Sequence, residues 1–474
     1  MGPGKSASVT AAANPLSADE RDTLSRGTAG DVRSIKTPTT TGSGRGLLAQ
    51  KKDAPESVSD RTVSLGTAGD AYPEGGIRAW LVVLGCWLAL FASLGFMNSL
   101  STFRTYLTDN HPIQVGPGAL GGAIFGYASL SLLLGVYAGP LFDCYGPRWL
   151  ILAGTGCLVV SFLLASFSTE SGHLLAALGI LSSLATPLLF TPSVAAIGHF
   201  FKSRRGLATG VAMTGSSASA VIFPFILQSL FMKVGWAWAM RALALICLSI
   251  AVATNFLIRS RLAPVPGTAA ANPHPHGRIF RTKGFAPTVA AVFLAQFASF
   301  LPLSYMAAYA LSKGFTQLFS FEVVTILNAS SVAGRVLAGW WADRLGPFNA
   351  SVVFSSVAAM ACFGIWLPAG GTMPGIVIFA VVFGCTSGAG VTLAPVAVSR
   401  LCRTQEYGRY YGACYTIVSL GVLLAIPVAS TVVRGNRGEF WGLIIITGVF
   451  NLLAAAAFAA AKYSVVGRRI WLPF

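Results

Sequence analysis

Long apolar runs dominate the pattern of hydrophobic and polar positions along the chain. A helix of about 20 residues, rising ~1.5 Å per residue, crosses a hydrocarbon core of ~30 Å. Backbone groups inside lipid have no water to bind, so helices are the structure that such runs predict. Twelve runs are present, at residues 79–103, 119–142, 149–169, 172–198, 206–231, 237–258, 287–311, 319–342, 347–371, 374–399, 410–432 and 440–461. The pattern predicts an all-α membrane protein with twelve transmembrane helices.

Polar stretches divide this chain. Residues 1–77, rich in Ser, Thr, Ala and Gly, predict a disordered cytoplasmic tail. Residues 259–286 form a polar central loop with five Lys or Arg and a Pro/Gly-rich middle. This loop separates two six-helix halves, 78–258 and 287–462, and residues 463–474 form a cytoplasmic C-terminal tail. No signal-peptide core precedes the first run, so the first helix is expected to direct insertion.

No cofactor or metal site is indicated by the sequence. The eight cysteines lack metal-ligand spacing. His274 and His276 flank a proline in the central loop, where solvated histidines are commoner than ligands. The chain has no Gly-x-x-x-x-Gly-Lys-Ser/Thr loop, which argues against a primary pump. It also lacks clustered His, Cys or acidic residues at one membrane face, which argues against an enzyme.

Two loops repeat nearly in register. Gly, Asp, Gly and Pro recur in the two loops at a spacing of 200 residues. Two prolines of later helices, Pro192 and Pro224, recur as Pro395 and Pro427 at a spacing of 203 residues. The loop positions are Gly139, Asp143, Gly146 and Pro147, then Gly339, Asp343, Gly346 and Pro347. The matches predict two six-helix pseudo-repeats, related by an axis along the membrane normal.

The residue types of each repeated loop indicate a contact at a helix end. Its first glycine lets two helices approach closely, and its Gly-Pro pair makes a tight turn. Its aspartate sits at a helix end, where it can bind a neighbouring helix N-terminus or a nearby arginine. That arginine is Arg148 in the first copy and Arg344 in the second. We expect a cytoplasmic gate that breaks when the inner side opens; the alternative is a turn-stabilising pair with no switching role.

These features resemble the major facilitator superfamily. Three further stretches, Glu74–Trp80, His199–Gly210 and Gly235–Arg241, resemble the monocarboxylate-porter family in its fungal form. The resemblance covers residues 73–462. It implies a major facilitator fold and transport by alternating access, with cargoes from small carboxylates to riboflavin and secondary metabolites.

Arg335 is the strongest candidate for contact with a substrate. A charge in mid-membrane costs ~3 kcal/mol or more, and Asn328 and Ser331 lie on the same helix face as Arg335. This polar stripe suits a cavity lining; the alternative is an arginine paired with a backbone carbonyl or packed into the bundle. The resemblance agrees with the first interpretation, because the porter family has its substrate-anion arginine at this point.

Four further polar residues are candidates for substrate binding. They are Asn98, Tyr127, Gln296 and Tyr305. Each alone is more often a hydrogen bond between helices than a contact with a ligand. Proton-coupled members of the family carry an aspartate where this chain has Ser331 and a lysine in the first helix, where Asn98 is the nearest polar candidate. We therefore expect facilitated diffusion, or a proton carried by the substrate.

The distribution of charge predicts which side of the protein faces the cytosol. The chain carries 33 Lys or Arg against 16 Asp or Glu, a net charge of +17. The excess lies on one side: from Arg78 onward, loops on that side hold 17 basic and 3 acidic residues, and the other side holds 5 and 4. A strong basic excess can indicate nucleic-acid binding, but this distribution is the positive-inside pattern of a multi-pass protein with both ends in the cytosol.

The sequence predicts a plasma-membrane transporter of a small organic anion or secondary metabolite, with export of a biosynthetic product as an expected direction. Its expected partners are the bilayer and an anionic or polar small molecule, with no nucleic acid, and its expected state is a monomer. The alternatives are a transporter-like nutrient sensor that uses its long tail, and riboflavin-type vitamin uptake.

Overall fold

The computed structural model describes residues 72–99, 103, 106, 117–261 and 277–467 of the 474-residue chain, without side chains for 117–126 and 171. Most of the predicted N-terminal tail, the middle of the central loop and the end of the C-terminal tail lie outside these residues. Within them every regular element is helical, in keeping with the all-α prediction.

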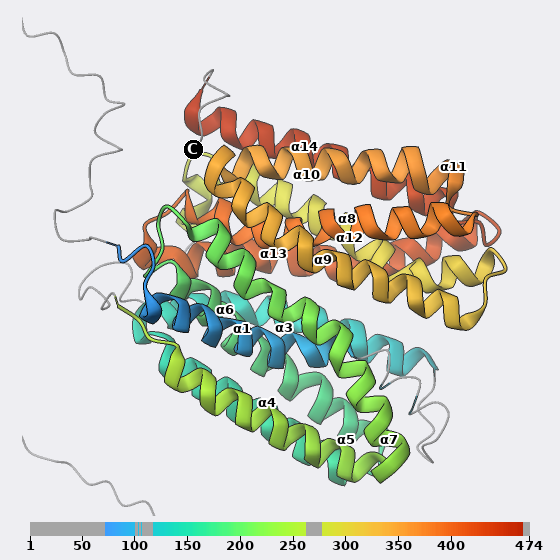
Figure 1. Cartoon of the computed structure of the whole chain (residues 1–474), viewed down its shortest axis with the longest axis horizontal. Coiled ribbons are helices and arrows are strands. Elements are labelled where there is room, and N and C mark those ends of the chain that lie inside the picture. Colours follow the sequence, from blue (N-terminus) through green and yellow to red (C-terminus); the bar gives the residue numbers. More distant parts are fainter. Residues whose placement is uncertain (1–71, 100–102, 104–105, 107–116, 262–276, 468–474) are drawn as a thin grey trace, which may run out of the picture. The chain divides into compact units, whose positions relative to one another are not determined.

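The helices fall into two groups along the chain (Figure 1). The N-terminal group consists of α1 (Ile77–Asn98), α3 (Pro117–Tyr145), α4 (Pro147–Phe167), α5 (Ser171–Leu174), the π-helical η2 (Leu175–Leu181), α6 (Ser182–Ile197) and α7 (Arg205–Leu257). The C-terminal group consists of η4 (Gly277–Arg281), α8 (Phe285–Ser312), α9 (Gln317–Leu345), α10 (Pro347–Ala361), η5 (Cys362–Trp366), α11 (Leu367–Ala369), α12 (Met373–Ser399), η6 (Thr404–Glu406), α13 (Tyr407–Gly435) and α14 (Trp441–Val466).

Eleven helices in the described ranges are long and apolar enough to cross a membrane. One of them, α7, has 53 residues, about twice the length that a bilayer requires. It is interrupted at Gly235, whose φ of 72° and ψ of 179° are not helical. The following residue, Trp236, donates from its indole nitrogen to the carbonyl oxygen of Ala165 at 2.8 Å, which ties the start of the second piece of α7 to α4.

The Gly-Pro pairs predicted as turns form such turns. Gly146 and Gly346 have φ of 74° and 83°, a region that favours glycine because it has no Cβ. The next residues, Pro147 and Pro347, occupy the first turn of α4 and α10, where the missing N–H costs no helical hydrogen bond.

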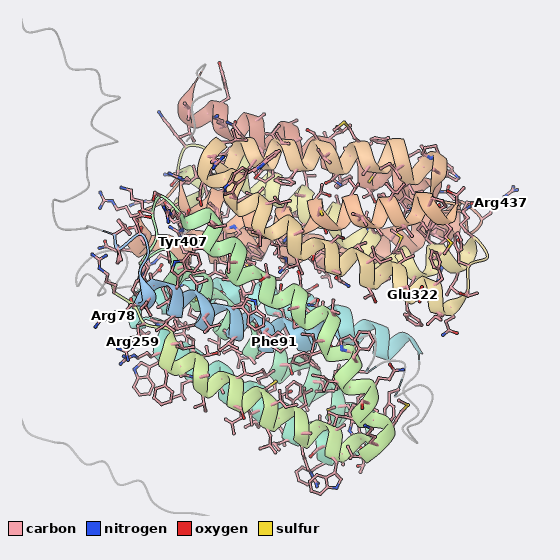
Figure 2. All side chains as sticks on the ribbon, in the orientation of Figure 1. Arg78, Phe91, Arg259, Glu322, Tyr407 and Arg437 are labelled. Atoms are coloured by element: carbon pink, nitrogen blue, oxygen red, sulfur yellow. The ribbon has the colours of Figure 1, made fainter. Side chains whose placement is uncertain are left out.

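Packing between the groups runs mainly through two helix pairs, α3 with α13 and α7 with α9. The basic residues Arg78 and Arg259 lie at the same end of the bundle as Tyr407, and Glu322 and Arg437 lie at the opposite end (Figure 2). We call these the Arg78 end and the Glu322 end.

Candidate functional site

Asp143, at the end of α3, caps a helix of the other group. Its carboxylate accepts hydrogen bonds from the backbone N–H groups of Gly408 and Arg409 at the start of α13, both at 3.0 Å. The side-chain Nε of Arg409 lies 3.7 Å from the same carboxylate, and both charged side chains are buried. The first N–H groups of a helix have no partner within it and carry partial positive charge. Asp143 therefore fastens α3 to α13.

Asp343 makes the equivalent contact from α9. Its carboxylate accepts from the backbone N–H groups of Gly206 at 2.7 Å and Leu207 at 2.8 Å, at the start of α7. We call the contacts of Asp143 and Asp343 the α13 clamp and the α7 clamp. Each clamp joins the two groups, so the Arg78 end of the bundle is closed.

Glycines four residues before each aspartate allow this approach. A Cβ at Gly139 would collide with the carbonyl oxygen of Gly408, and a Cβ at Gly339 would collide with that of Gly206. The partner glycines are equally tight, because Cβ atoms there would meet the carbonyl oxygens of Gly139 and Gly339. Both predicted close approaches are present, and both lie between the groups.

Of the two partners considered for the aspartates, the structure brings the helix N-terminus to each. The predicted arginines lie elsewhere. Arg148 is exposed, and the arginine beside Asp143 is Arg409. Arg344 is exposed too, with its guanidinium 3.9 Å from the ring centre of Trp340 on its own helix.

Arg335 reaches across from α9 to α7. One terminal guanidinium nitrogen donates to the carbonyl oxygen of Met213 and to the hydroxyl of Ser216. Its Nε is buried and has no hydrogen-bond acceptor among the described residues. These contacts match the alternative in which the arginine pairs with a backbone carbonyl, and they make Arg335 a further tie between the groups.

Two other predicted residues meet at the same stretch of α7. The side-chain amide of Asn98 donates to the carbonyl oxygen of Ser216 at 3.0 Å. The hydroxyl of Ser331 lies 2.7 Å from that of Ser217 and also bonds to the carbonyl oxygen of Asn328 at 2.7 Å. Asn98, Ser331 and Arg335 thus converge on two adjacent serines, and Asn328 lies one turn away, half-buried.

The remaining three candidates lie apart from this convergence. The hydroxyl of Tyr127 is 2.6 Å from that of Thr186, inside the N-terminal group. Gln296 is buried beside Tyr415. The hydroxyl of Tyr305 reaches the carbonyl oxygen of Ile426 at 3.4 Å.

A cavity lies between the two groups, with walls from α1, α3, α6 and α13. It has about 450 Å³ of space unoccupied by atoms, part of it open to solvent. The surface of the lining is almost entirely apolar, although Ser131, Thr186, Thr191, Tyr411 and Tyr415 are among the lining residues. We call it the inter-group cavity.

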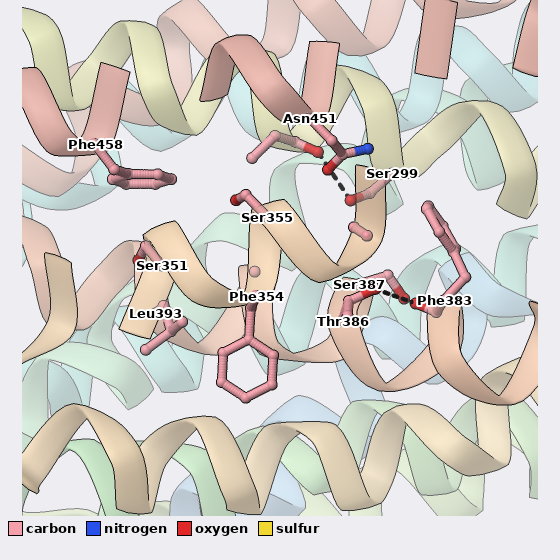
Figure 3. A pocket seen from close by; sticks show the side chains of 13 residues that line it. Ser299, Ser351, Phe354, Ser355, Phe383, Thr386, Ser387, Leu393, Asn451 and Phe458 are labelled. Atoms are coloured by element: carbon pink, nitrogen blue, oxygen red, sulfur yellow. Dashed lines mark hydrogen bonds between the residues drawn. The ribbon is translucent and has the colours of Figure 1, made fainter. Parts of the chain in front are cut away.

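A second cavity of about 350 Å³ lies inside the C-terminal group, between α8, α10, α12 and α14 (Figure 3). Its polar side chains are Ser299, Ser351, Ser355, Thr386, Ser387 and Asn451. Ser299 and Thr386 donate to carbonyl oxygens of their own helices, as the dashed lines show. Because one group supplies the entire lining, this cavity does not span the two groups.

A segment just before α1 reinforces the Arg78 end. The carboxylate of Glu74 accepts from the backbone N–H groups of Lys202 at 3.0 Å, Ser203 at 2.8 Å and Arg204 at 3.3 Å, and from the Ser203 hydroxyl at 2.7 Å. Burial raises the pKa of Glu74, but these hydrogen bonds outweigh it and lower the pKa below the usual value. Glu74 therefore stays charged and holds the residues that lead into α7.

The same segment reaches the other group. The hydroxyl of Tyr72 lies 3.3 Å from that of Thr404, just before α13. The ammonium group of Lys202 lies 5.8 Å from the ring centre of Tyr72. We call residues 72–76 the strap, because it contacts the residues leading into both clamped helices.

A row of tyrosines on α13 was not among the residues predicted from the sequence. Tyr407, Tyr411 and Tyr415 follow each other at four-residue spacing, which places them on one helix face. Their ring centres are 5.6 Å and 4.5 Å apart, and the guanidinium of Arg205 lies 4.6 Å from the Tyr407 ring. The spacing was the available signal: three large polar rings on one face of an otherwise apolar run.

Comparison with known proteins gives a consistent family. The sequence profile described as Major Facilitator Superfamily matches residues 82–426. An MFS-type transporter of Ophiocordyceps sp. is 33% identical over 400 residues, covering 84% of this chain and 88% of that protein. The fujikurins efflux protein of Gibberella fujikuroi is 31% identical over 410 residues, covering 84% and 85%. The riboflavin transporter MCH5 of Saccharomyces cerevisiae is 25% identical over 426 residues, covering 85% and 82%.

Solved structures share the fold. The transporter FucP, crystallised in the outward conformation, superposes with a TM-score of 0.66 at 16% identity, covering 81% of this chain and 98% of that chain. At that identity the likeness concerns the fold alone. The profile match, which spans most of the chain, and a relative at 33% identity establish the family. The chain belongs to the Major Facilitator Superfamily.

Proposed function

We propose that this transporter moves a small organic molecule by alternating access, with the cargo held in the inter-group cavity. The observation that carries the proposal is that both helix groups wall this cavity, next to the contacts that close the Arg78 end. Gly135, which lines the cavity, is one turn from Gly139 in the α13 clamp. A site shared by two groups changes its access when the groups rock against each other.

We assign the observed arrangement to an outward-facing state. Both clamps are closed at the end that carries most of the basic residues, and basic loops face the cytosol. The same rule puts both termini in the cytosol, and we propose the plasma membrane as the site of action. The crystallised outward conformation of FucP, a fold neighbour, is in keeping with this assignment.

The chain is proposed to cross the membrane twelve times, in two related six-helix halves. The support is the break at Gly235, which divides the 53-residue α7 into two pieces that are each long enough to span. The repeated clamp geometry supports the related halves. All walls of the inter-group cavity come from one chain, so a monomer suffices.

The cargo is proposed to be an organic metabolite that the cell exports. Relatives of this chain are named as efflux proteins for fujikurins and aspyridones. Another relative is named as a riboflavin transporter, which supports vitamin uptake as the second candidate. Among superfamily branches, we assign the chain to monocarboxylate-porter-like transporters of the fungal type, on the strength of the Glu74–Trp80 signature.

Arg335 is proposed to act as a reversible tie. Its bonds to Met213 and Ser216 must break if α7 and α9 separate, which would free the guanidinium for an anionic or electron-rich cargo group. Ser331 and Asn98 are uncharged and engaged with α7. Transport is therefore proposed to need no protein proton carrier at these positions.

A pair of glycine variants tests the site. Gly135 is buried and lines the cavity, and a Cβ there would meet no atom within 4 Å, so the larger side chain of Gly135→Leu should begin in open space and narrow the cavity. Gly156 on α4 is exposed and equally open, which makes Gly156→Leu the matched control. Proteoliposomes would be incubated with a fungal metabolite extract, and their contents identified by mass spectrometry.

The expected result is accumulation of some compounds by the wild type and by Gly156→Leu, with a loss of at least about tenfold in Gly135→Leu. Equal accumulation by Gly135→Leu would reject the inter-group cavity as the site. Accumulation no greater than in protein-free liposomes would reject transport of the organic compounds present in the extract.

A further inference from the structure

Arg205 reaches from one helix group to the other at the Arg78 end. It begins α7, and its guanidinium lies 4.6 Å from the ring centre of Tyr407, which begins α13. A Cβ at Gly198 would lie 2.6 Å from the guanidinium carbon, so this group also packs against the residue that follows α6. Arg205 is half-buried, and within the described part of the chain its guanidinium has no hydrogen-bond acceptor and no ion pair. Its N–H donors are therefore held in place and open to an outside partner.

A second arginine lies nearby on the C-terminal group. Arg400 directly follows α12 and is exposed as a whole residue. Loss of surrounding water lowers the pKa of its guanidinium, and the positive charge of Arg205 lowers it further. Among the described residues, Arg400 also has no side-chain hydrogen bond and no ion pair. Two positive charges from different groups therefore lie close together at the closed end, where they repel each other.

The acids of this region do not balance the two arginines. Asp343 partly offsets the lowered pKa of Arg400, but its carboxylate already accepts the first N–H groups of α7. Asp143 accepts those of α13. Glu74 and Glu406 form no ion pair with either arginine in the ranges that the structure describes. Positive charge is therefore in excess where the groups meet, and a bound anion would relieve that excess.

A phosphate group fits this pair of arginines better than a halide ion. Guanidinium groups are planar, and their parallel N–H donors match phosphate oxygens two at a time. A phosphate monoester carries about two negative charges at neutral pH, which offsets two arginines. The packing of Arg205 on Tyr407 fixes its orientation beforehand, so less side-chain freedom is lost on binding. Burial lowers the pKa of His199, and Arg205 and Arg261 lower it further, so the positive field extends past the two arginines.

We propose that Arg205 and Arg400 bind a phosphate group that joins the two helix groups at the Arg78 end and stabilises the closed arrangement. The bound group replaces repulsion between the groups with attraction of both to one anion. The site lies apart from the inter-group cavity, whose described lining has no charged residue, so it adds a regulatory ligand to the proposed function. In the proposed orientation this end faces the cytosol, so the phosphate group belongs either to an anionic lipid headgroup of that leaflet or to a soluble compound.

Hydrogen exchange of the purified full-length chain tests the site. Inorganic phosphate is titrated in nanodiscs of phosphatidylcholine and compared with sodium chloride at the same ionic strength and pH, since salt alone screens repulsion. A second arm uses nanodiscs that contain phosphatidylinositol bisphosphate, without added phosphate. Relative to chloride, exchange of residues 203–210 and 404–412 should slow by about threefold to tenfold in at least one arm, the range expected for partly exposed charge-assisted bonds.

Variants connect the slowing to the two guanidinium groups. Arg400→Gln removes one charge at an exposed position, and Arg205→Gln removes the other, so each should reduce the slowing to less than about twofold. Each variant is compared with itself in chloride, so a change in its basal closure does not enter the result. Arg148→Gln is the matched control, because Arg148 is an exposed arginine in the first turn of α4, and it should retain the wild-type response.

The two arms also distinguish the sources of the phosphate group. Slowing by inorganic phosphate assigns the ligand to soluble compounds, and slowing confined to the phosphoinositide nanodiscs assigns it to a lipid headgroup. Slowing in neither arm would overturn the proposal, as would slowing that persists in both Arg205→Gln and Arg400→Gln. None of these results bears on the cargo, because the inter-group cavity is tested separately by Gly135→Leu.

Discussion

The two clamps use the same geometry in different surroundings. In both, an aspartate near a helix end accepts two backbone N–H bonds from the first turn of a helix in the other group. At the α13 clamp, Asp143 is fully buried and has Arg409 beside it. At the α7 clamp, Asp343 is half-buried, and the residues leading into α7 are held by Glu74 of the strap.

This difference separates a buried contact from an adjustable one. A buried carboxylate with a buried arginine is costly to break, because either partner alone would be left uncompensated. Hydrogen bonds at a half-buried surface carboxylate such as Glu74 are weakened by competing water and by salt. The strap also lies at the start of the membrane-spanning part, directly after the N-terminal tail. The α7 clamp is therefore the contact at the closed end that is more sensitive to the salt concentration and pH of the surrounding solution.

Asp143→Ala should have the largest effect. It removes the acceptor of two helix N–H groups and the carboxylate beside Arg409, and breaking a buried pair costs about 3–5 kcal/mol. Such a loss corresponds to at least a ~100-fold shift in a local opening equilibrium. Hydrogen exchange of residues 404–412 by mass spectrometry should accelerate by that factor, while residues 203–210 change much less. Acceleration below about tenfold would contradict a dominant α13 clamp.

Asp343→Ala should act on the other helix and more weakly. Hydrogen bonds to a charged group contribute about 1.5–3 kcal/mol each when buried, and half-exposure reduces this. Exchange of residues 203–210 should accelerate by about tenfold, with Glu74 still holding the preceding residues. An effect equal to that of Asp143→Ala would remove the distinction between the clamps.

Much of the fold could be predicted from hydropathy alone, because lipid sets the length and polarity of a helix. The runs 287–311 and 374–399 lie within two residues of α8 and α12 at each end. The runs 206–231 and 237–258 correspond to α7, where a break at Gly235 replaces a separate loop. The π-helical turn η2 inside the run 172–198 had no signal in the pattern.

The candidate site was less accessible to sequence reasoning. The spacing of Gly139, Asp143 and Gly146 indicates a helix-end contact, but the partner of Asp143 lies 265 residues away, where only the packing of the two groups brings it. The direction of the Arg335 side chain depends on the carbonyl oxygen of Met213, which no residue type reveals. Long-range backbone partners of this kind leave no local pattern.

Glu74→Gln should loosen the strap without opening the α13 clamp. The amide keeps the size of the side chain but weakens the charge-assisted bonds to Lys202, Ser203 and Arg204, which are partly exposed. Exchange of residues 203–210 should accelerate by about twofold to fivefold, and residues 404–412 should stay within about twofold of wild type. In the double variant Glu74→Gln with Asp343→Ala, the free energy of local opening should fall by more than the sum of the two single changes if the strap and the α7 clamp hold the same helix start.

Protonation of Glu74 at low pH should accelerate hydrogen exchange of residues 203–210, as Glu74→Gln does at neutral pH. The folded-state pKa of Glu74 is lowered below its usual 4.5, so its contribution is complete above pH 4.5 and is lost as the pH falls further. Burial lowers the pKa of nearby His199 to about 4, with Arg205 and Arg261 adding to the shift, so its contribution is lost earlier, as the pH falls from 6.5 toward 4. Exchange of residues 203–210, corrected for the intrinsic pH dependence, should therefore show an additional step below pH 4.5 in the wild type. Glu74→Gln lacks the titrating carboxyl of the strap and should lose the part of the step that this carboxyl contributes. A step below pH 4.5 that persists unchanged in this variant would assign it to another carboxyl, such as Asp343 of the α7 clamp.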